Sequence, residues 1–144
     1  MTDQPHKFSN PLKTAQGEDR AWVAPTVLKT LWLNTGTLCN LACANCYIES
    51  TPKNDRLVYL TLREVIPYLD EIRDNLLRTD EIGITGGEPF MNPDIIPILT
   101  ECLSRGFRVL CLTNAMRPMM KLADALIALK DTYGDQMVLR VSID

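Results

Sequence analysis

Short apolar runs bounded by glycine, proline or polar residues recur four times along the chain. Each run is rich in β-branched, aromatic or alternating apolar side chains, which predicts a β-strand. In the last run, Ser142 and Asp144 would share one face, because successive side chains alternate across a strand. The four expected strands are Thr30–Asn34, Glu81–Thr85, Phe107–Thr113 and Met137–Asp144.

The segment after Thr61 has the pattern of an amphipathic helix. Thr61 and Glu64 form a capping box, with a hydroxyl N-cap and a carboxylate three residues later. Pro67 lies inside the segment and favours a local kink or a later helix start. The apolar positions recur at helical spacing and predict one buried face, made of Leu62, Val65, Ile66, Leu69, Ile72 and Leu76.

Two further helices are expected between the later strands. One would begin at Asn92-Pro93, with the asparagine as N-cap and the proline in the first helical position, and would end at Gly106. The other would span Pro118–Lys130. Its inward positions would be Met119, Leu122, Ala123, Leu126 and Ile127.

Strands and helices therefore alternate three times before a last strand. This order predicts an α/β fold with parallel strands and right-handed crossover connections. We expect one domain over residues 21–144, preceded by a polar, flexible arm over residues 1–20. The apolar segment Ala21–Lys29, which contains Trp22 and Val23, would cover one end of the core.

Composition and charge exclude several classes of protein. The chain has 144 residues, 46% hydrophobic and 23% charged, as in an ordinary globular domain. Its net charge is −3 and its basic residues are scattered, so it carries no nucleic-acid footprint. No apolar run is long enough to span a membrane, and the N-terminus lacks a signal-peptide pattern. We expect no membrane partner and a cytoplasmic location, where clustered cysteines indicate metal or redox chemistry.

Three of the five cysteines follow the first strand, as Cys39, Cys43 and Cys46 in the order C-x3-C-x2-C. A structural zinc site would need a fourth ligand, and the other two, Cys102 and Cys111, look like small buried hydrophobes. A thioredoxin-like pair at Cys43 and Cys46 would leave Cys39 unexplained. An iron–sulfur cluster on three thiolates would keep one iron without a protein ligand, whereas electron carriers normally use four cysteines. Catalytic metal sites keep such an open position for substrate or cofactor.

Polar residues also follow the ends of the other expected strands. Thr113-Asn114 ends the third strand, and Ser142 to Asp144 closes the fourth. The glycine-rich stretch after the second strand has two interpretations. It is an ordinary turn, or it is a place where a ligand can approach the backbone closely, beside a carboxylate that suits an ammonium group. Because the carboxyl ends of parallel strands meet at one edge, we expect a single site there. That stretch consists of Gly86, Gly87, Glu88 and Pro89.

The cysteine spacing, followed by the aromatic Tyr47 and placed after the first strand of a βα series, resembles the signature of the radical S-adenosylmethionine (SAM) superfamily. Gly86-Gly87-Glu88 resembles its GGE motif, and the likeness covers about residues 30–144. It implies that Cys39, Cys43 and Cys46 hold a 4Fe–4S cluster whose fourth iron binds the amino and carboxylate groups of SAM. By the same resemblance, the GGE motif with Pro89 contacts the amino group and Tyr47 lies beside the adenine. Asn114 would help to hold the carboxylate, and Ser142 and Asp144 would contact the ribose.

The resemblance also implies a reaction. One electron from an external flavodoxin- or ferredoxin-like reductant would cleave SAM, and the resulting 5′-deoxyadenosyl radical would abstract hydrogen from an unknown substrate. No catalytic side chain is assigned beyond the cluster ligands. The alternative interpretation is a non-catalytic fragment or interaction module that binds an iron–sulfur cluster or zinc and lacks the rest of the barrel.

The superfamily's core is an open, partial (β/α)6 barrel of the TIM type, and this chain would supply only part of it. We expect about four parallel strands and about three helices. The edge of the strand at Met137–Asp144 would be bare, which favours aggregation unless something covers it. We interpret the chain as truncated or as half of a split assembly, with a missing C-terminal half or a partner covering that edge.

Overall fold

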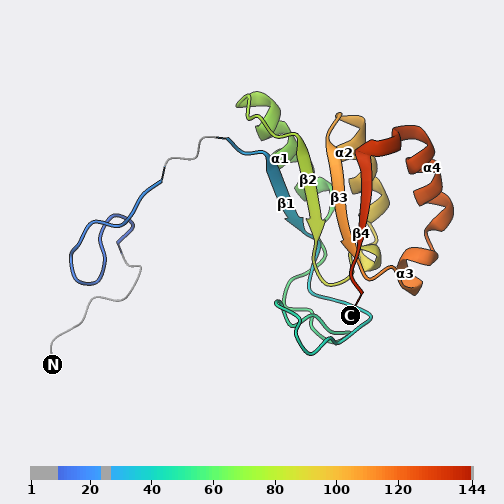
Figure 1. Ribbon diagram of the computed structural model, residues 1–144, viewed down its shortest axis with the longest axis horizontal. Coiled ribbons are helices and arrows are strands. Elements are labelled where there is room, and N and C mark those ends of the chain that lie inside the picture. The colour runs from blue at the N-terminus through green and yellow to red at the C-terminus, as the bar shows by residue number, and fades with distance from the viewer. Residues whose placement is uncertain (1–9, 24–26, 144) are drawn as a thin grey trace.

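Four parallel strands form one open sheet in the computed structural model, which describes residues 10–23 and 27–143. The strands follow the chain in the order β1-β2-β3-β4, so each connection is a crossover to the next position (Figure 1). This confirms the expected α/β fold with a partial barrel sheet that is not closed. The strands are β1 (Thr30–Asn34), β2 (Glu81–Thr85), β3 (Arg108–Thr113) and β4 (Met137–Val141).

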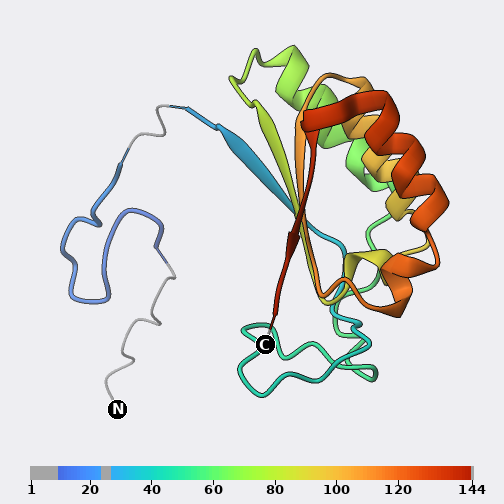
Figure 2. The ribbon, with the colours of Figure 1, turned by 45° about the vertical axis from the view of Figure 1, so that its right-hand side comes forward.

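The helices gather on one face of this sheet, as Figure 2 shows for α1, α2 and α4. In the described part of the chain, none of them is long and apolar enough to cross a membrane. The α-helices are α1 (Leu62–Asp74), α2 (Ile95–Ser104), α3 (Arg117–Met120) and α4 (Ala123–Tyr133). Two short 3₁₀ helices, η1 (Pro89–Met91) and η2 (Gly134–Gln136), complete the connections.

The core lies between the helices and the sheet. Alternate residues of β2 and β3 face it, and the parallel register sets Ile82 beside Val109 and Ile84 beside Cys111. All four of these side chains are buried, and helix residues such as Leu69 complete the cluster. Cys102 and Cys111 are fully buried, as the sequence predicted.

The opposite face of the sheet carries no helix among the described residues. On this face Trp32 of β1 lies over Gly83 of β2, where an added Cβ would come within 2.4 Å of the indole ring. A glycine in a strand interior often marks such a close approach. Trp32 remains 47% exposed, so its ring forms part of the open face.

Helix α1 begins as predicted, and α2 does not. Thr61 caps α1 through the complete capping box, and Pro67 is accommodated inside the helix. Leu76 was wrongly included in the buried face, because the helix ends before it and its side chain is exposed. Asn92 is not an N-cap, since α2 starts at Ile95 after Asp94. The Asn92 side chain instead accepts the Asp94 N–H and is buried.

Three other expectations are corrected near the chain ends. The expected helix Pro118–Lys130 is two helices, α3 and α4, and Ile127, which was expected to face inward, is 58% exposed beside β4. Strand β4 stops at Val141, so Ser142 lies just beyond the strand. Trp22 and Val23 are exposed and do not cover the core. Asp144 lies outside the described residues, as does the segment 1–9 of the predicted arm.

Candidate functional site

The chain that leaves β1 crosses the carboxyl ends of the strands and carries the three clustered cysteines (Figure 1). Its start is fixed to β2, because the Thr35 N–H donates to the Thr85 carbonyl at 2.8 Å. Farther along, the Cys39 N–H donates to the Thr51 carbonyl at 3.2 Å, which ties the two arms of the loop together. The cysteines thus sit at the edge where the parallel strands end, as the sequence predicted.

The glycine pair after β2 packs against this cysteine loop. The Gly87 N–H donates to the Gly36 carbonyl at 2.8 Å, and the Glu88 N–H donates to the Leu38 carbonyl at 3.0 Å. A Cβ on Gly87 would lie 2.1 Å from the Leu38 carbonyl oxygen, so no larger residue fits. Gly86 has a positive φ of 147°, which glycine adopts without strain. The close backbone approach at Gly87 is therefore made by the chain itself.

The Glu88 carboxylate is buried at the centre of the site, with 2% of the residue exposed. Its Oε1 accepts the Thr113 hydroxyl at 2.8 Å and the Phe90 N–H at 3.2 Å. Its Oε2 accepts the Asn114 N–H at 2.9 Å. A carboxylate oxygen can accept two hydrogen bonds, so Oε2 keeps one acceptor position beyond these three donors. The carboxylate therefore joins the ends of β2 and β3 and retains capacity for one more donor.

The Asn114 side chain connects the end of β3 to the cysteine loop. Its Nδ2 donates to Asn40 Oδ1 at 3.0 Å and to Cys39 Sγ at 3.7 Å. Its Oδ1 accepts the Met116 N–H at 3.0 Å, which closes a tight turn. Ala115, inside that turn, has a positive φ of 53°. Asn114 is thus held in one orientation by contacts on three sides.

The three clustered sulfurs have different surroundings. Cys39 is buried and accepts the Leu41 N–H at 3.4 Å, while the partly exposed Cys46 accepts the Ser50 N–H at 3.3 Å. Cys43 is exposed and shares a turn with Cys46, whose N–H donates to the Cys43 carbonyl at 3.2 Å. Across residues 10–23 and 27–143, no three cysteine, histidine, aspartate or glutamate side chains are gathered closely enough to hold a metal ion. The chemistry of the three side chains nevertheless fits an iron–sulfur cluster. The thiols form no disulfide, and backbone N–H groups donate to the sulfurs of Cys39 and Cys46.

Burial and hydrogen bonding set the thiol pKa values apart. Burial raises the pKa of Cys39, and the nearby Glu88 carboxylate adds to this, while the Leu41 N–H opposes it. At Cys46 partial burial also acts to raise the pKa, but backbone N–H groups, above all that of Ser50, hold the pKa below its usual value. Because a metal binds the thiolate form, the lower pKa of Cys46 favours ligation by its sulfur, whereas the raised pKa of Cys39 opposes it.

Three of the remaining residues predicted for the site, Tyr47, Pro89 and Ser142, also lie at this edge. The Tyr47 hydroxyl is 3.4 Å from Thr85 Oγ1, and the rest of the Tyr47 side chain is exposed. Pro89 is buried as the first residue of η1. The Ser142 N–H donates to the Thr113 carbonyl at 2.9 Å, which places Ser142 beside the Glu88 network. Asp144 lies outside the described residues.

Sequence reasoning missed three polar residues that shape the site. Asn40 receives the Asn114 amide, although it stands inside the cysteine motif as an apparent spacer. Thr37 is fully buried, and its hydroxyl donates to the Asn54 carbonyl and so holds the far arm of the loop. The Asn92 amide donates to the carbonyls of Thr35 and Leu60. A polar residue between apolar neighbours was the available signal for Asn92.

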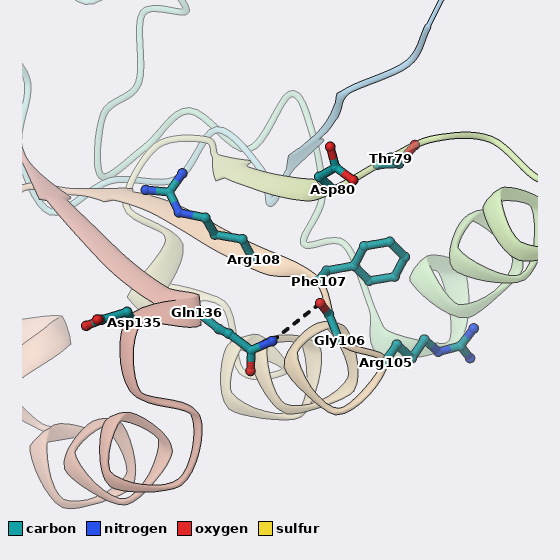
Figure 3. A pocket seen from close by; sticks show the side chains of 8 residues that line it. All are labelled: Thr79, Asp80, Arg105, Gly106, Phe107, Arg108, Asp135 and Gln136. Atoms are coloured by element: carbon teal, nitrogen blue, oxygen red, sulfur yellow. Dashed lines mark hydrogen bonds between the residues drawn. The ribbon is translucent and has the colours of Figure 1, made fainter.

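Two hollows of about 500 Å³ lie away from the cysteines. One is at the opposite edge of the sheet and is lined by Arg105 and Arg108, and Gln136 donates to the Gly106 carbonyl there (Figure 3). Both arginines are already paired with carboxylates, so this hollow is not a preformed anion site. The other is an apolar groove between α4 and β4.

Solved structures with a similar fold include those of one bacterial protein, SuiB. Streptococcus suis SuiB bound to S-adenosylmethionine superposes with a TM-score of 0.65 at 19% identity, over 82% of this chain and 25% of SuiB. SuiB bound to its precursor peptide SuiA gives the same TM-score and identity. At this identity the likeness concerns the fold alone.

Sequence relatives reach higher identity. The chain is 34% identical over 106 residues to the antilisterial bacteriocin subtilosin biosynthesis protein AlbA of Bacillus subtilis (strain 168), covering 74% of this chain and 22% of AlbA. It is 32% identical over 76 residues to an S-adenosylmethionine-dependent nucleotide dehydratase of Selenomonas ruminantium, covering 53% of this chain and 26% of that protein. The chain thus spans about a quarter of the length of the proteins it matches. Residues 33–144 match the radical SAM superfamily, and the chain therefore belongs to that superfamily.

Proposed function

We propose that Cys39, Cys43 and Cys46 hold a 4Fe–4S cluster and that the adjoining strand ends bind SAM. The observation that carries the proposal is that hydrogen bonds join the cysteine loop, the end of β3 and the turn after β2 at the carboxyl edge of the sheet. The Cys39 sulfur accepts hydrogen bonds from the cysteine loop and from the end of β3, and β3 is joined to the turn after β2 through Glu88. Hydrogen bonds of this kind orient and tune cluster ligands. Because the three sulfurs are not gathered closely enough to hold a metal in the described structure, cluster binding would have to bring them together, as metal binding often orders its own site.

Glu88 is the residue that we assign to the amino group of SAM. Its Oε2 has one acceptor position left after the Asn114 N–H, and the carboxylate has no cation partner among the described residues. A buried carboxylate without a counter-charge favours a cationic ligand. Tyr47, Asn114 and Ser142 lie near enough at the same edge to take part. We assign further cofactor contacts to Gly86, Gly87, Pro89 and Asp144.

When bound, the cluster and SAM would supply one-electron reductive cleavage of the sulfonium and hydrogen abstraction from a substrate. This chain's own residues would bind and orient them and would exclude water, for which the buried Glu88 and Cys39 are suited. An external flavodoxin- or ferredoxin-like protein would supply the electron. Since AlbA is a biosynthesis protein for a bacteriocin, we propose a peptide as the substrate class.

The remaining parts of the proposal concern organisation. Residues 21–144 would form the partial core domain and residues 1–20 an arm outside it. We place the protein in the cytoplasm, where clustered thiols stay reduced.

Anaerobic reconstitution with iron and sulfide tests the cluster. We expect about four irons and four sulfides per chain, with loss of the cluster in Cys39→Ala, Cys43→Ala and Cys46→Ala. Cys102→Ala is the matched control, because Cys102 is buried in α2 and should not affect loading. Zinc without labile sulfide in the purified protein, or loading that survives all three substitutions, would refute the proposal.

The second candidate function is cluster binding without catalysis, because the chain spans about a quarter of its relatives' length. A fragment of the barrel could bind the cluster without turning over SAM. Release of 5′-deoxyadenosine from the reconstituted chain under dithionite separates the two. Release above the level of Cys46→Ala supports the enzyme, and a fully loaded chain that releases none supports the fragment.

A further inference from the structure

Asn114 makes more contacts than binding a SAM carboxylate would require. Its backbone N–H is held by Glu88, its Oδ1 by the Met116 N–H, and its Nδ2 is directed at Asn40 and Cys39. Both hydrogens of the amide group are therefore used within the protein. These contacts hold the Asn114 amide in a fixed orientation beside the cysteine loop, whatever else it contacts when SAM is bound.

The residues before and after Asn114 serve the same placement. The Thr113 hydroxyl donates to Glu88 Oε1 and accepts the Ala115 N–H at 2.9 Å. Ala115 adopts a positive φ, which costs a non-glycine residue energy and persists only when its surroundings impose it. The turn after β3 is thus built around the Glu88 carboxylate, and it aims the Asn114 amide at the cysteine loop.

We propose that Asn114 is a positioning residue for Cys39 and that its amide raises the reduction potential of a cluster bound there. The Asn114 amide and the Leu41 N–H both donate to the Cys39 sulfur, and the same amide also holds the next residue, Asn40. A donor at a cluster sulfur stabilises the more negative, reduced state, and hydrogen bonds to sulfur are one of the factors that set such potentials. The positioning stands on the geometry alone, whereas the effect on potential rests on the proposed function.

Glu88 acts through Asn114 in this arrangement. Its Oε2 accepts the Asn114 N–H and so fixes the residue whose side chain reaches Cys39. In Glu88→Gln an amide would replace one carboxylate oxygen and would face either that N–H or the donors at Oε1. We therefore expect Glu88→Gln to loosen the cysteine loop, although the Glu88 side chain is linked to the Cys39 sulfur only through Asn114.

The first measurement needs no cofactor. Amide hydrogen exchange is followed by NMR in the 144-residue chain for the wild type, Asn114→Ala and Glu88→Gln. The reporter is the Leu41 N–H, which donates to Cys39 Sγ. We expect its exchange to become about fivefold faster in both variants, the effect of losing one ordinary hydrogen bond. The Ile82 N–H in the core sheet serves as the internal reference for overall stability.

The second measurement is a redox titration of the reconstituted cluster, followed by electron paramagnetic resonance. Asn114→Ala and Asn114→Asp should both shift the midpoint potential to more negative values, and the aspartate should shift it further because it adds a negative charge. Asn10→Asp is the matched control, because it makes the same change of charge at an exposed asparagine. The Asn10 side-chain oxygen accepts the Leu12 and Lys13 N–H groups, which an aspartate oxygen can also accept. That control should leave the potential unchanged.

The two measurements test the positioning role and the tuning role of Asn114 separately. Unchanged Leu41 exchange in Asn114→Ala would overturn the positioning role, whether or not a cluster binds. A potential in Asn114→Ala equal to that of the wild type would overturn the tuning role, even if Asn114→Asp shifts it by charge. A wild-type chain that takes up no cluster would refute the proposed function and the tuning with it, while the exchange measurement would still decide the positioning.

Discussion

Gly87→Ala is the substitution for which the structure gives the sharpest expectation. The new Cβ would lie 2.1 Å from the Leu38 carbonyl oxygen and 2.6 Å from its carbon. Both atoms are backbone, so no side-chain rotation can relieve the overlap. Either the cysteine loop or the turn after β2 has to move away.

The expected cost follows from what this movement breaks. Forcing a methyl group into a filled space costs about 1–3 kcal/mol. The Gly87 N–H to Gly36 and the Glu88 N–H to Leu38 bonds cross the same contact, and each contributes about 1 kcal/mol. We therefore expect Gly87→Ala to lower the free energy of unfolding by about 3–5 kcal/mol, a large share of the 5–15 kcal/mol typical of a domain.

Urea unfolding followed by far-UV circular dichroism measures this cost, with Gly106→Ala as the matched control. Gly106 has a positive φ of 89° and nothing within 4 Å of its Cβ position, so alanine there should cost only about 1–2 kcal/mol of backbone strain. NMR shifts of the amides from Thr35 to Leu41 should change in Gly87→Ala and not in the control. Equal stability losses in the two variants, with an undisturbed cysteine loop, would refute the packing of Gly87 against Leu38.

Three further predictions concern helix capping, core packing and thiol reactivity. Thr61→Ala removes the hydroxyl of the capping box and should lower the free energy of unfolding by about 1 kcal/mol in the same urea assay. Ile98→Ala empties a fully buried position in α2 and should cost about 2–5 kcal/mol there, whereas Ile127→Ala, at an exposed position in α4, should cost much less. Burial raises the pKa of Cys102 to about 12. About one part in ten thousand of that thiol is therefore thiolate at pH 8, and mass spectrometry after iodoacetamide treatment should find Cys43 alkylated long before Cys102.

The sequence predicted the sheet well because strand and helix periodicities are local. Ile82 and Ile84 alternate with less apolar neighbours in β2, and burial of that face is what the pattern describes. The same reasoning found the α1 capping box at Thr61, since both partners lie within one turn. It also put the polar strand ends at one edge, because all four strands are parallel.

The errors arose where a distant contact decides a local conformation. Asn92-Pro93 has the pattern of a helix start, but the Asn92 amide bonds to Thr35 and Leu60, which lie 57 and 32 residues away. The Pro118–Lys130 segment has a continuous apolar pattern, yet α3 and α4 are separate helices, and Ile127 is exposed in the groove between α4 and β4. Neither the pairing of Asn92 nor the break after α3 leaves a periodic signal in the sequence.

The same distinction explains what the sequence could say about the site. The sequence alone identified Glu88, Asn114 and Cys39 as candidate site residues, each from its own motif. That they touch depends on the register of β1, β2 and β3, which sets Asn34 beside Thr85 and Ile84 beside Cys111. A shift of one residue in that register would turn every side chain to the other face and would separate the Glu88 carboxylate from Thr113 and Asn114. The hydrogen bonds from Glu88 to Asn114 and from Asn114 to Cys39 therefore depend on the packing of the sheet core. It follows that core substitutions which alter strand register should disturb the Cys39 environment, because the Cys39 sulfur accepts a hydrogen bond from Asn114 at the end of β3.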